Sequence, residues 1–111
     1  MTVKKDAGEL LKFMYDRYTQ GSLKIASQDV INETDWEATR INNALDFLKD
    51  IGALKIVLSA GNTRGVKNFF VHGLTPVGID MIENEDKFKT TFGFEAGIPL
   101  FKFSWKREKE H

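Results

Sequence analysis

Apolar residues recur every three or four positions near the start of the chain, which is the spacing of an amphipathic helix. Asp6 and Glu9 resemble a capping box at its beginning, and Gly21 stands where a helix is expected to stop. A shorter run of the same kind follows Ser27, a residue type that favours the N-cap position. The pattern therefore predicts a long helix, a short strand at Leu23–Ile25 and a second, shorter helix. The apolar side of the first helix consists of Leu10, Leu11, Met14, Tyr15 and Tyr18.

The clearest helical pattern follows Thr34. Thr34 and Glu37 match the Thr-x-x-Glu capping box, which predicts a helix that begins at Asp35 and ends before Gly52. Its apolar stripe, expected to face the core, consists of Ile41, Ala44, Leu45, Leu48 and Ile51. Its opposite face, expected to meet solvent, carries Asp35, Thr39, Asn42, Asn43, Asp46 and Asp50.

Two strand-like segments come next. Residues 54–58 and 67–72 are rich in β-branched and aromatic side chains, and they flank the glycine- and asparagine-containing segment SAGNTRGV. This arrangement predicts a β-hairpin. Thr75 and Pro76 then have the residue types of an N-cap and a first helical position, so another short helix is expected there.

The end of the chain alternates aromatic and polar residues with the period of a half-buried strand. Together with a turn at Ala96–Gly97, this pattern predicts a C-terminal β-hairpin over residues 87–106. Its aromatic face either covers the core or pairs with a second copy of the chain, and we expect both uses. The hypothesis of a homodimer interface therefore rests on Phe92, Phe94, Phe101, Phe103 and Trp105.

Composition narrows the classes of function. A chain of 111 residues is expected to form a single domain, residues 1–111, that folds without disulfides. The absence of cysteine excludes thiolate metal sites and cysteine nucleophiles, and the two histidines lack metal-ligand spacing. Because no phosphate-binding glycine loop is present either, we expect no cofactor, no metal and no enzymatic activity. The absence of an apolar run of about 20 residues and of a signal peptide predicts a cytoplasmic protein with no membrane partner.

The charges are balanced overall but unevenly distributed. Sixteen basic and sixteen acidic residues give a net charge of zero. Residues 26–52 contain two basic and six acidic residues, a balance of −4, whereas residues 53–75 contain three basic residues and no acidic one, a balance of +3. Since lysine and arginine neutralise nucleic-acid phosphates, the hairpin is better suited to DNA than the helix before it.

The order of these elements resembles the winged helix-turn-helix superfamily of small prokaryotic regulators. In MarR-like and PadR-like members, a phrase Leu-Thr-x-x-Gly begins the helix after the wing, and here it reads Leu74-Thr75-Pro76-Val77-Gly78. The likeness covers residues 5–84 and leaves the segment after Asp86 unmatched. It implies an α+β winged helix-turn-helix, to which the C-terminal β-hairpin is added.

The resemblance also implies a site. Helix 35–51 would be the recognition helix that enters the DNA major groove, and residues 59–67 would be the wing. Carried over by position, the DNA-binding residues would be Trp36, Thr39, Arg40, Asn42, Asn43, Asn62, Thr63, Arg64 and Lys67. Among them, Asn42 and Asn43 could hydrogen-bond to adenine edges, and Arg40 could bind guanine or a phosphate. Trp36 lies off the core stripe, and we expect it to pack on a neighbouring element rather than on a base.

Two functions remain open at this point. The first is a transcriptional-regulator-type protein that binds double-stranded DNA as a homodimer. The alternative is a winged-helix protein–protein interaction module that does not bind DNA, in which the acidic helix face meets a basic partner. A positive surface shared by the N-terminus, the wing and the tail would favour the first function. A continuous negative surface over the second helix and helix 35–51 would favour the second.

Overall fold

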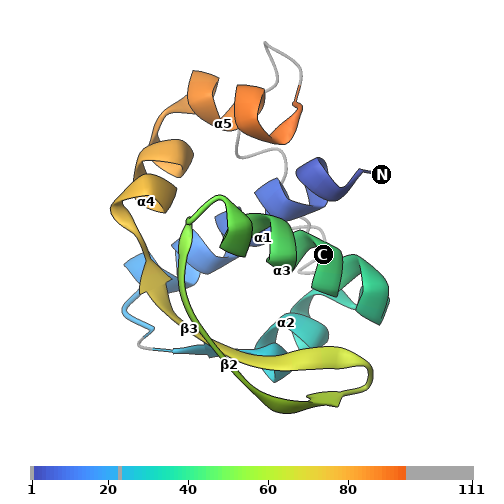
Figure 1. The fold of residues 1–111 in the computed structure, drawn as a ribbon. Coiled ribbons are helices and arrows are strands. Elements are labelled where there is room, and N and C mark those ends of the chain that lie inside the picture. The colour runs from blue at the N-terminus through green and yellow to red at the C-terminus, as the bar shows by residue number, and fades with distance from the viewer. Residues whose placement is uncertain (1, 23, 95–111) are drawn as a thin grey trace, which may run out of the picture.

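The computed structural model describes residues 2–22 and 24–94 (Figure 1). Over these ranges the fold is mixed α+β, with five helices and a small three-stranded antiparallel sheet. Within them, no helix has the length and apolar composition needed to cross a membrane. The elements, in chain order, are α1 (Val3–Thr19), β1 (Ile25–Ala26), α2 (Ser27–Thr34), α3 (Ala38–Asp50), β2 (Leu54–Thr63), β3 (Val66–Leu74), α4 (Pro76–Glu83) and α5 (Glu85–Phe92).

Helix α1 begins earlier than its sequence pattern predicts. Thr2 is the N-cap, and its hydroxyl accepts a hydrogen bond from the Lys5 backbone N–H at 3.2 Å. Asp6 therefore lies inside the helix, where it is buried and paired with Arg40 rather than acting as a cap. At the other end Gly21 adopts a left-handed backbone with φ 93°, so the predicted stop is confirmed.

The boundary between α2 and α3 also differs from the prediction. The Thr34 hydroxyl donates to the Val30 carbonyl at 2.8 Å, which makes Thr34 the last residue of α2 rather than a cap of α3. Asp35 ends α2 in a left-handed conformation, with φ 56°. A residue with this backbone conformation cannot belong to a right-handed helix. Helix α3 therefore begins at Ala38, and the predicted start at Asp35 is wrong. Helix α2 has its N-cap at Ala26, one residue before the predicted Ser27, because the Asp29 carboxylate accepts from the Ala26 N–H at 2.8 Å.

The sheet has the strand order β1-β3-β2. The predicted hairpin is present, but its strands are longer, because pairing continues to Thr63 opposite Val66. The turn is therefore only two residues long, Arg64 with φ 54° and Gly65 with φ 86°. Positive φ at both central residues is the signature of a type I′ turn, whose twist matches that of the flanking strands. The short strand β1 pairs with β3 at Phe70 and Val71.

The core lies between α1, α3 and one face of the sheet. The predicted apolar stripe of α3 is confirmed for Ile41, Ala44, Leu45 and Leu48, which are buried. Ile51, the fifth residue of that stripe, is the C-cap and is only partly buried. Phe69 and Val71 of β3 complete this core from the sheet side. Helices α4 and α5 lie at the opposite end of the molecule from the hairpin turn (Figure 1). The arrangement is compatible with a winged helix.

Helix α5 replaces the first part of the predicted C-terminal hairpin. Residues 87–92 are helical, so the hairpin predicted over 87–106 is wrong there, and residues 95–106 lie outside the described residues. Phe88 and Phe92 are four residues apart, face α1 on one side of α5, and are both fully buried. Gly8 of α1 makes this packing close, because a Cβ added there would lie 2.9 Å from the Phe92 Cβ.

Helix α4 is tied to both the sheet and α1. The predicted start is confirmed: Thr75 is the N-cap, its hydroxyl accepts from the Gly78 N–H at 3.1 Å, and Pro76 opens the first turn. The Tyr15 hydroxyl of α1 donates to Glu83 at 2.7 Å. This hydrogen bond raises the pKa of Tyr15, because the neutral phenol is the form that donates.

Candidate nucleic-acid interface

The hairpin tip, residues 62–67, is bonded directly to helix α3. The Asn42 amide nitrogen donates to the Gly65 carbonyl at 3.0 Å, and its oxygen accepts from the Lys67 backbone N–H at 3.1 Å. Both polar atoms of a residue that the resemblance assigned to base readout are therefore used to hold the hairpin. The Lys67 ammonium also lies 3.6 Å from the Asp46 carboxylate, an exposed pair of the kind that contributes little to stability.

The tip is shaped by its own side chains. Asn62 accepts from the Gly65 N–H at 3.2 Å across the turn, and the Thr63 hydroxyl donates to Asn68 at 2.8 Å. These two predicted DNA contacts thus have roles in the turn itself. Arg64 differs from them, because it is exposed at the first central position of the turn. Within the described part of the chain, its guanidinium has no hydrogen bond or ion pair.

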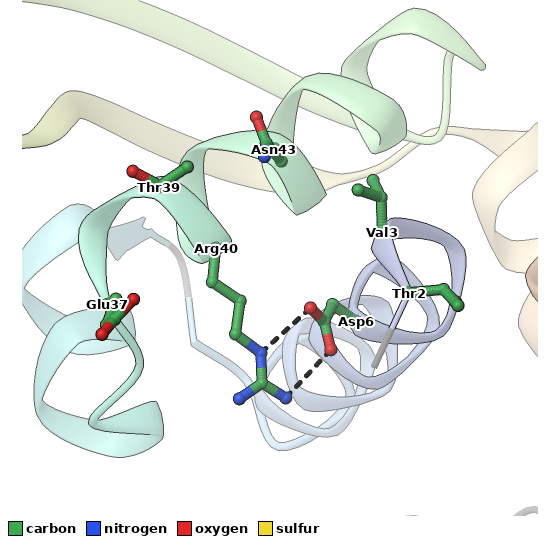
Figure 2. Close-up of a pocket in the computed structure, with 7 residues that line it drawn as sticks. All are labelled: Thr2, Val3, Asp6, Glu37, Thr39, Arg40 and Asn43. Atoms are coloured by element: carbon green, nitrogen blue, oxygen red, sulfur yellow. Dashed lines mark hydrogen bonds and ion pairs between the residues drawn. The ribbon is translucent and has the colours of Figure 1, made fainter.

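A cleft of about 280 Å³ lies where the first turns of α1 and α3 meet (Figure 2). Arg40 of α3 crosses it toward α1, as Figure 2 shows, and donates from Nε and Nη2 to the two Asp6 carboxylate oxygens, both at 2.9 Å. The Asp6 side chain is only 7% exposed and that of Arg40 is 28% exposed. Such a bidentate pair holds the guanidinium in one orientation. The residues that line the cleft are Thr2, Val3, Asp6, Glu37, Thr39, Arg40 and Asn43.

Trp36 holds Arg40 from a second side. The guanidinium carbon lies 4.0 Å from the centre of the Trp36 ring, a cation–π arrangement. The ring is partly buried and packs against the core. Trp36 and Arg40 therefore act within the protein fold, and the expectation that Trp36 packs on its neighbours is consistent with this position.

Two neutral polar side chains of α3 remain exposed at the cleft. Thr39 and Asn43 lie one helical turn apart on the same side of α3 (Figure 2), and both have hydrogen-bonding groups that face outward. The carboxylates of Asp35 and Glu37 are exposed just before α3 begins. Glu37 occupies the N-cap position without bonding the first turn, so the leading end of α3 is acidic while its first backbone N–H groups lack a side-chain cap.

Sequence reasoning missed the role of Asp6. It was expected to cap α1, and its position in the sequence, 34 residues before Arg40, contains no local signal of their pairing. The contribution of Gly65 was missed for the same reason. The Gly65 carbonyl accepts a hydrogen bond from Asn42. Because Gly65 has no side chain, Ala38 can pack against it: a Cβ added to Gly65 would lie only 3.0 Å from the Ala38 Cβ.

The described members of the proposed dimer surface face inward. Phe92 is fully buried, and Phe94 is half-buried and stacked on Phe88 with ring centroids 5.5 Å apart. Both side chains therefore serve the packing of α5 on α1. The remaining three residues of that hypothesis, Phe101, Phe103 and Trp105, lie outside the described residues.

The groups exposed at this surface can form hydrogen bonds and ion pairs. In residues 2–22 and 24–94, no group of three or more histidine, aspartate or glutamate side chains is placed to hold a metal ion. The hairpin tip presents a cation, and α3 presents a hydroxyl and an amide. No family model, curated protein or solved structure matches the chain.

Proposed function

We propose that this protein is a winged helix-turn-helix protein that binds double-stranded DNA. Helix α3 would lie in the major groove, and the hairpin of β2 and β3 would be the wing that follows the phosphate backbone. The order helix, strand, helix, helix, strand, strand and the central position of β3 in the sheet support this assignment. The observation that carries it is the attachment of the hairpin tip to α3 by two hydrogen bonds of Asn42, with Arg64 exposed in the adjoining turn.

The contacts inside the protein limit what such a complex can read. Arg40 is bonded to Asp6 and Asn42 to the hairpin, so Thr39 and Asn43 are the exposed α3 side chains at the cleft that can meet base edges. A hydroxyl and one amide discriminate fewer bases than a bidentate arginine does. We therefore expect most of the affinity to come from phosphate contacts and the preference among sequences to be modest.

Removing the charge at the hairpin tip tests the proposal. We expect Arg64→Asn to weaken binding to all duplexes and to lower the slope of log affinity against log salt by about 0.9, the contribution of one phosphate contact. Asparagine is chosen because Arg64 has φ 54°, a conformation that asparagine tolerates better than alanine. The measurement is a fluorescence anisotropy titration of a labelled random duplex at several salt concentrations.

Lys49→Ala is the matched control for loss of one positive charge. Lys49 is exposed in the last turn of α3, away from the hairpin tip, and its loss should leave the salt slope unchanged. Equal effects of the two substitutions would show general attraction to a charged surface. An unchanged slope for Arg64→Asn would remove Arg64 from the interface, and no binding of the wild-type protein at low salt would refute DNA binding.

The second candidate is a protein-interaction module that does not bind DNA. It is favoured by one observation: Asp35 and Glu37 are exposed at the leading end of α3, while the nearby Arg40 is neutralised by Asp6. A basic peptide would then be the natural partner. Its test is an anisotropy titration with a labelled oligolysine peptide, in which Glu37→Gln should weaken binding and the duplex should not compete.

The homodimer remains a separate prediction, and its residues are now Phe101, Phe103 and Trp105. For a two-fold dimer to contact successive turns on one face of DNA, its two α3 helices would have to lie about 34 Å apart. We expect the full chain to sediment as a dimer at tens of micromolar and the triple serine variant of these residues to sediment as a monomer. A monomeric wild-type chain would contradict the prediction.

A further inference from the structure

The outer edge of strand β3 is covered by two different elements. Near its middle, β3 pairs with β1 at Phe70 and Val71. Strand β1 is only two residues long, so it does not extend along β3 toward the hairpin tip. There the edge of β3 meets the side of helix α3.

At this edge the Asn42 side chain makes hydrogen bonds of the kind that a neighbouring strand would make. Its side-chain amide has a donor nitrogen and an acceptor oxygen, the same two kinds of group that a strand residue offers through its backbone. It donates to the Gly65 carbonyl and accepts from the Lys67 N–H, on either side of Val66, whose own partner across the hairpin is Thr63. One side chain thereby continues the hydrogen bonding of β3 to the turn.

The neighbours of Asn42 on α3 support the same contact. Ala38, Asn42 and Asp46 are successive members of an i, i+4 row and so lie on one side of the helix. Ala38 packs at Gly65, where an added Cβ would be only 3.0 Å from the Ala38 Cβ, and Asp46 approaches the Lys67 ammonium at 3.6 Å. Each residue of this row therefore contacts the hairpin tip, and Asn42, in the middle, is the one that does so through hydrogen bonds.

We propose that Asn42 is a positioning residue, which fixes the hairpin tip, and with it Arg64, at one place relative to the exposed face of α3. It would not read a base, since both of its polar atoms are directed at the backbone of the hairpin. The consequence for DNA affinity rests on the proposed function. The positioning itself does not, because it concerns contacts within one chain.

Amide hydrogen exchange of the full-length protein tests the positioning directly. In Asn42→Ala the Lys67 N–H loses its acceptor, so its exchange should become roughly tenfold faster than in the wild type. Asn42→Asp keeps an acceptor for Lys67 but loses the donor to Gly65, and its effect should be intermediate. Asn43→Ala removes the same amide from the next position of α3, where it is exposed, and should leave the exchange of Lys67 unchanged.

Exchange of Lys67 that is unchanged in Asn42→Ala, or equally accelerated in Asn43→Ala, would overturn the proposal. These measurements need no DNA. They therefore decide the role of Asn42 even if the wild-type protein binds no duplex, in which case the proposed function alone fails.

A double-mutant cycle connects the positioning to binding. Asn42→Ala should weaken binding to the random duplex about as much as Arg64→Asn does, and it should add nothing in a protein that already carries Arg64→Asn. Equal losses in both backgrounds would mean that Asn42 contacts DNA itself, which would overturn its assignment as a positioning residue.

Discussion

Replacing Leu45 by alanine is expected to lower the free energy of unfolding by about 2–5 kcal/mol. Leu45 is 1% exposed and lies in the middle of the α3 stripe that packs on the core. The substitution removes three carbon atoms from an environment without water and leaves a cavity that its neighbours fill only in part. The effect should appear in urea denaturation as a lower midpoint with an unchanged m value.

Leu58→Ala is the matched control for this substitution. Leu58 lies in the hairpin with 45% of its surface exposed, so the same three atoms are lost where water already reaches the side chain. We expect its cost to stay below about 1 kcal/mol. Similar costs at the two positions would contradict the packing of α3 through this stripe.

Replacing Gly78 by alanine should also destabilise the protein, by about 1–3 kcal/mol. The direction is informative, because alanine in place of glycine inside a helix usually stabilises it by about 0.5–1 kcal/mol. Here an added Cβ would lie 2.2 Å from the Ala53 carbonyl oxygen. That oxygen accepts the Thr75 N–H at 3.1 Å, so it cannot move away without loss of the bond that holds α4 to the start of β2.

Thermal and urea unfolding of Gly78→Ala should be compared with those of Val77→Ala. Val77 precedes Gly78 in the same helix and is 48% exposed, so its truncation should change stability by less than about 1 kcal/mol. If Gly78→Ala left stability unchanged or increased it, α4 would not be seated against Ala53 as the structure has it.

The contacts of Gly78 also account for the phrase Leu-Thr-x-x-Gly. Thr75 caps α4 by accepting from the Gly78 N–H, and Gly78 allows the helix to approach the Ala53 carbonyl. Thr75 and Gly78 thus both contribute to the packing of α4 against the start of β2. Such a phrase carries information about the fold and none about the molecule that the protein binds.

Local periodicity was sufficient to predict several elements of this protein. The α3 stripe was predicted correctly because a helix buries every third or fourth residue whatever it packs against, and Ile41, Leu45 and Leu48 follow that rule. The hairpin was predicted because turn-forming residues stood between two strand-like segments. The hairpin prediction was wrong over residues 87–92 because Phe92 and Phe94 have strand spacing whereas Phe88 and Phe92 have helix spacing. The sequence alone does not choose between the two.

The predicted start of α3 was wrong for a related reason. Thr34 and Glu37 have the residue types of a capping box, but the Thr34 hydroxyl bonds the Val30 carbonyl of the preceding helix instead. A side chain that can serve either of two neighbouring helices is assigned only by the backbone around it, here the left-handed turn at Asp35.

The candidate site depended most on tertiary structure. The sequence by itself determined which polar residue types line one side of α3 and that a basic hairpin follows it. It did not determine that Arg40 pairs with Asp6, 34 residues away, or that Asn42 bonds Gly65, 23 residues away. Periodicity is a property of neighbouring residues in one element, whereas the partner of a polar side chain depends on which elements pack together. Only the packing of α1 and the hairpin against α3 decided which of these side chains bind within the protein and which face outward.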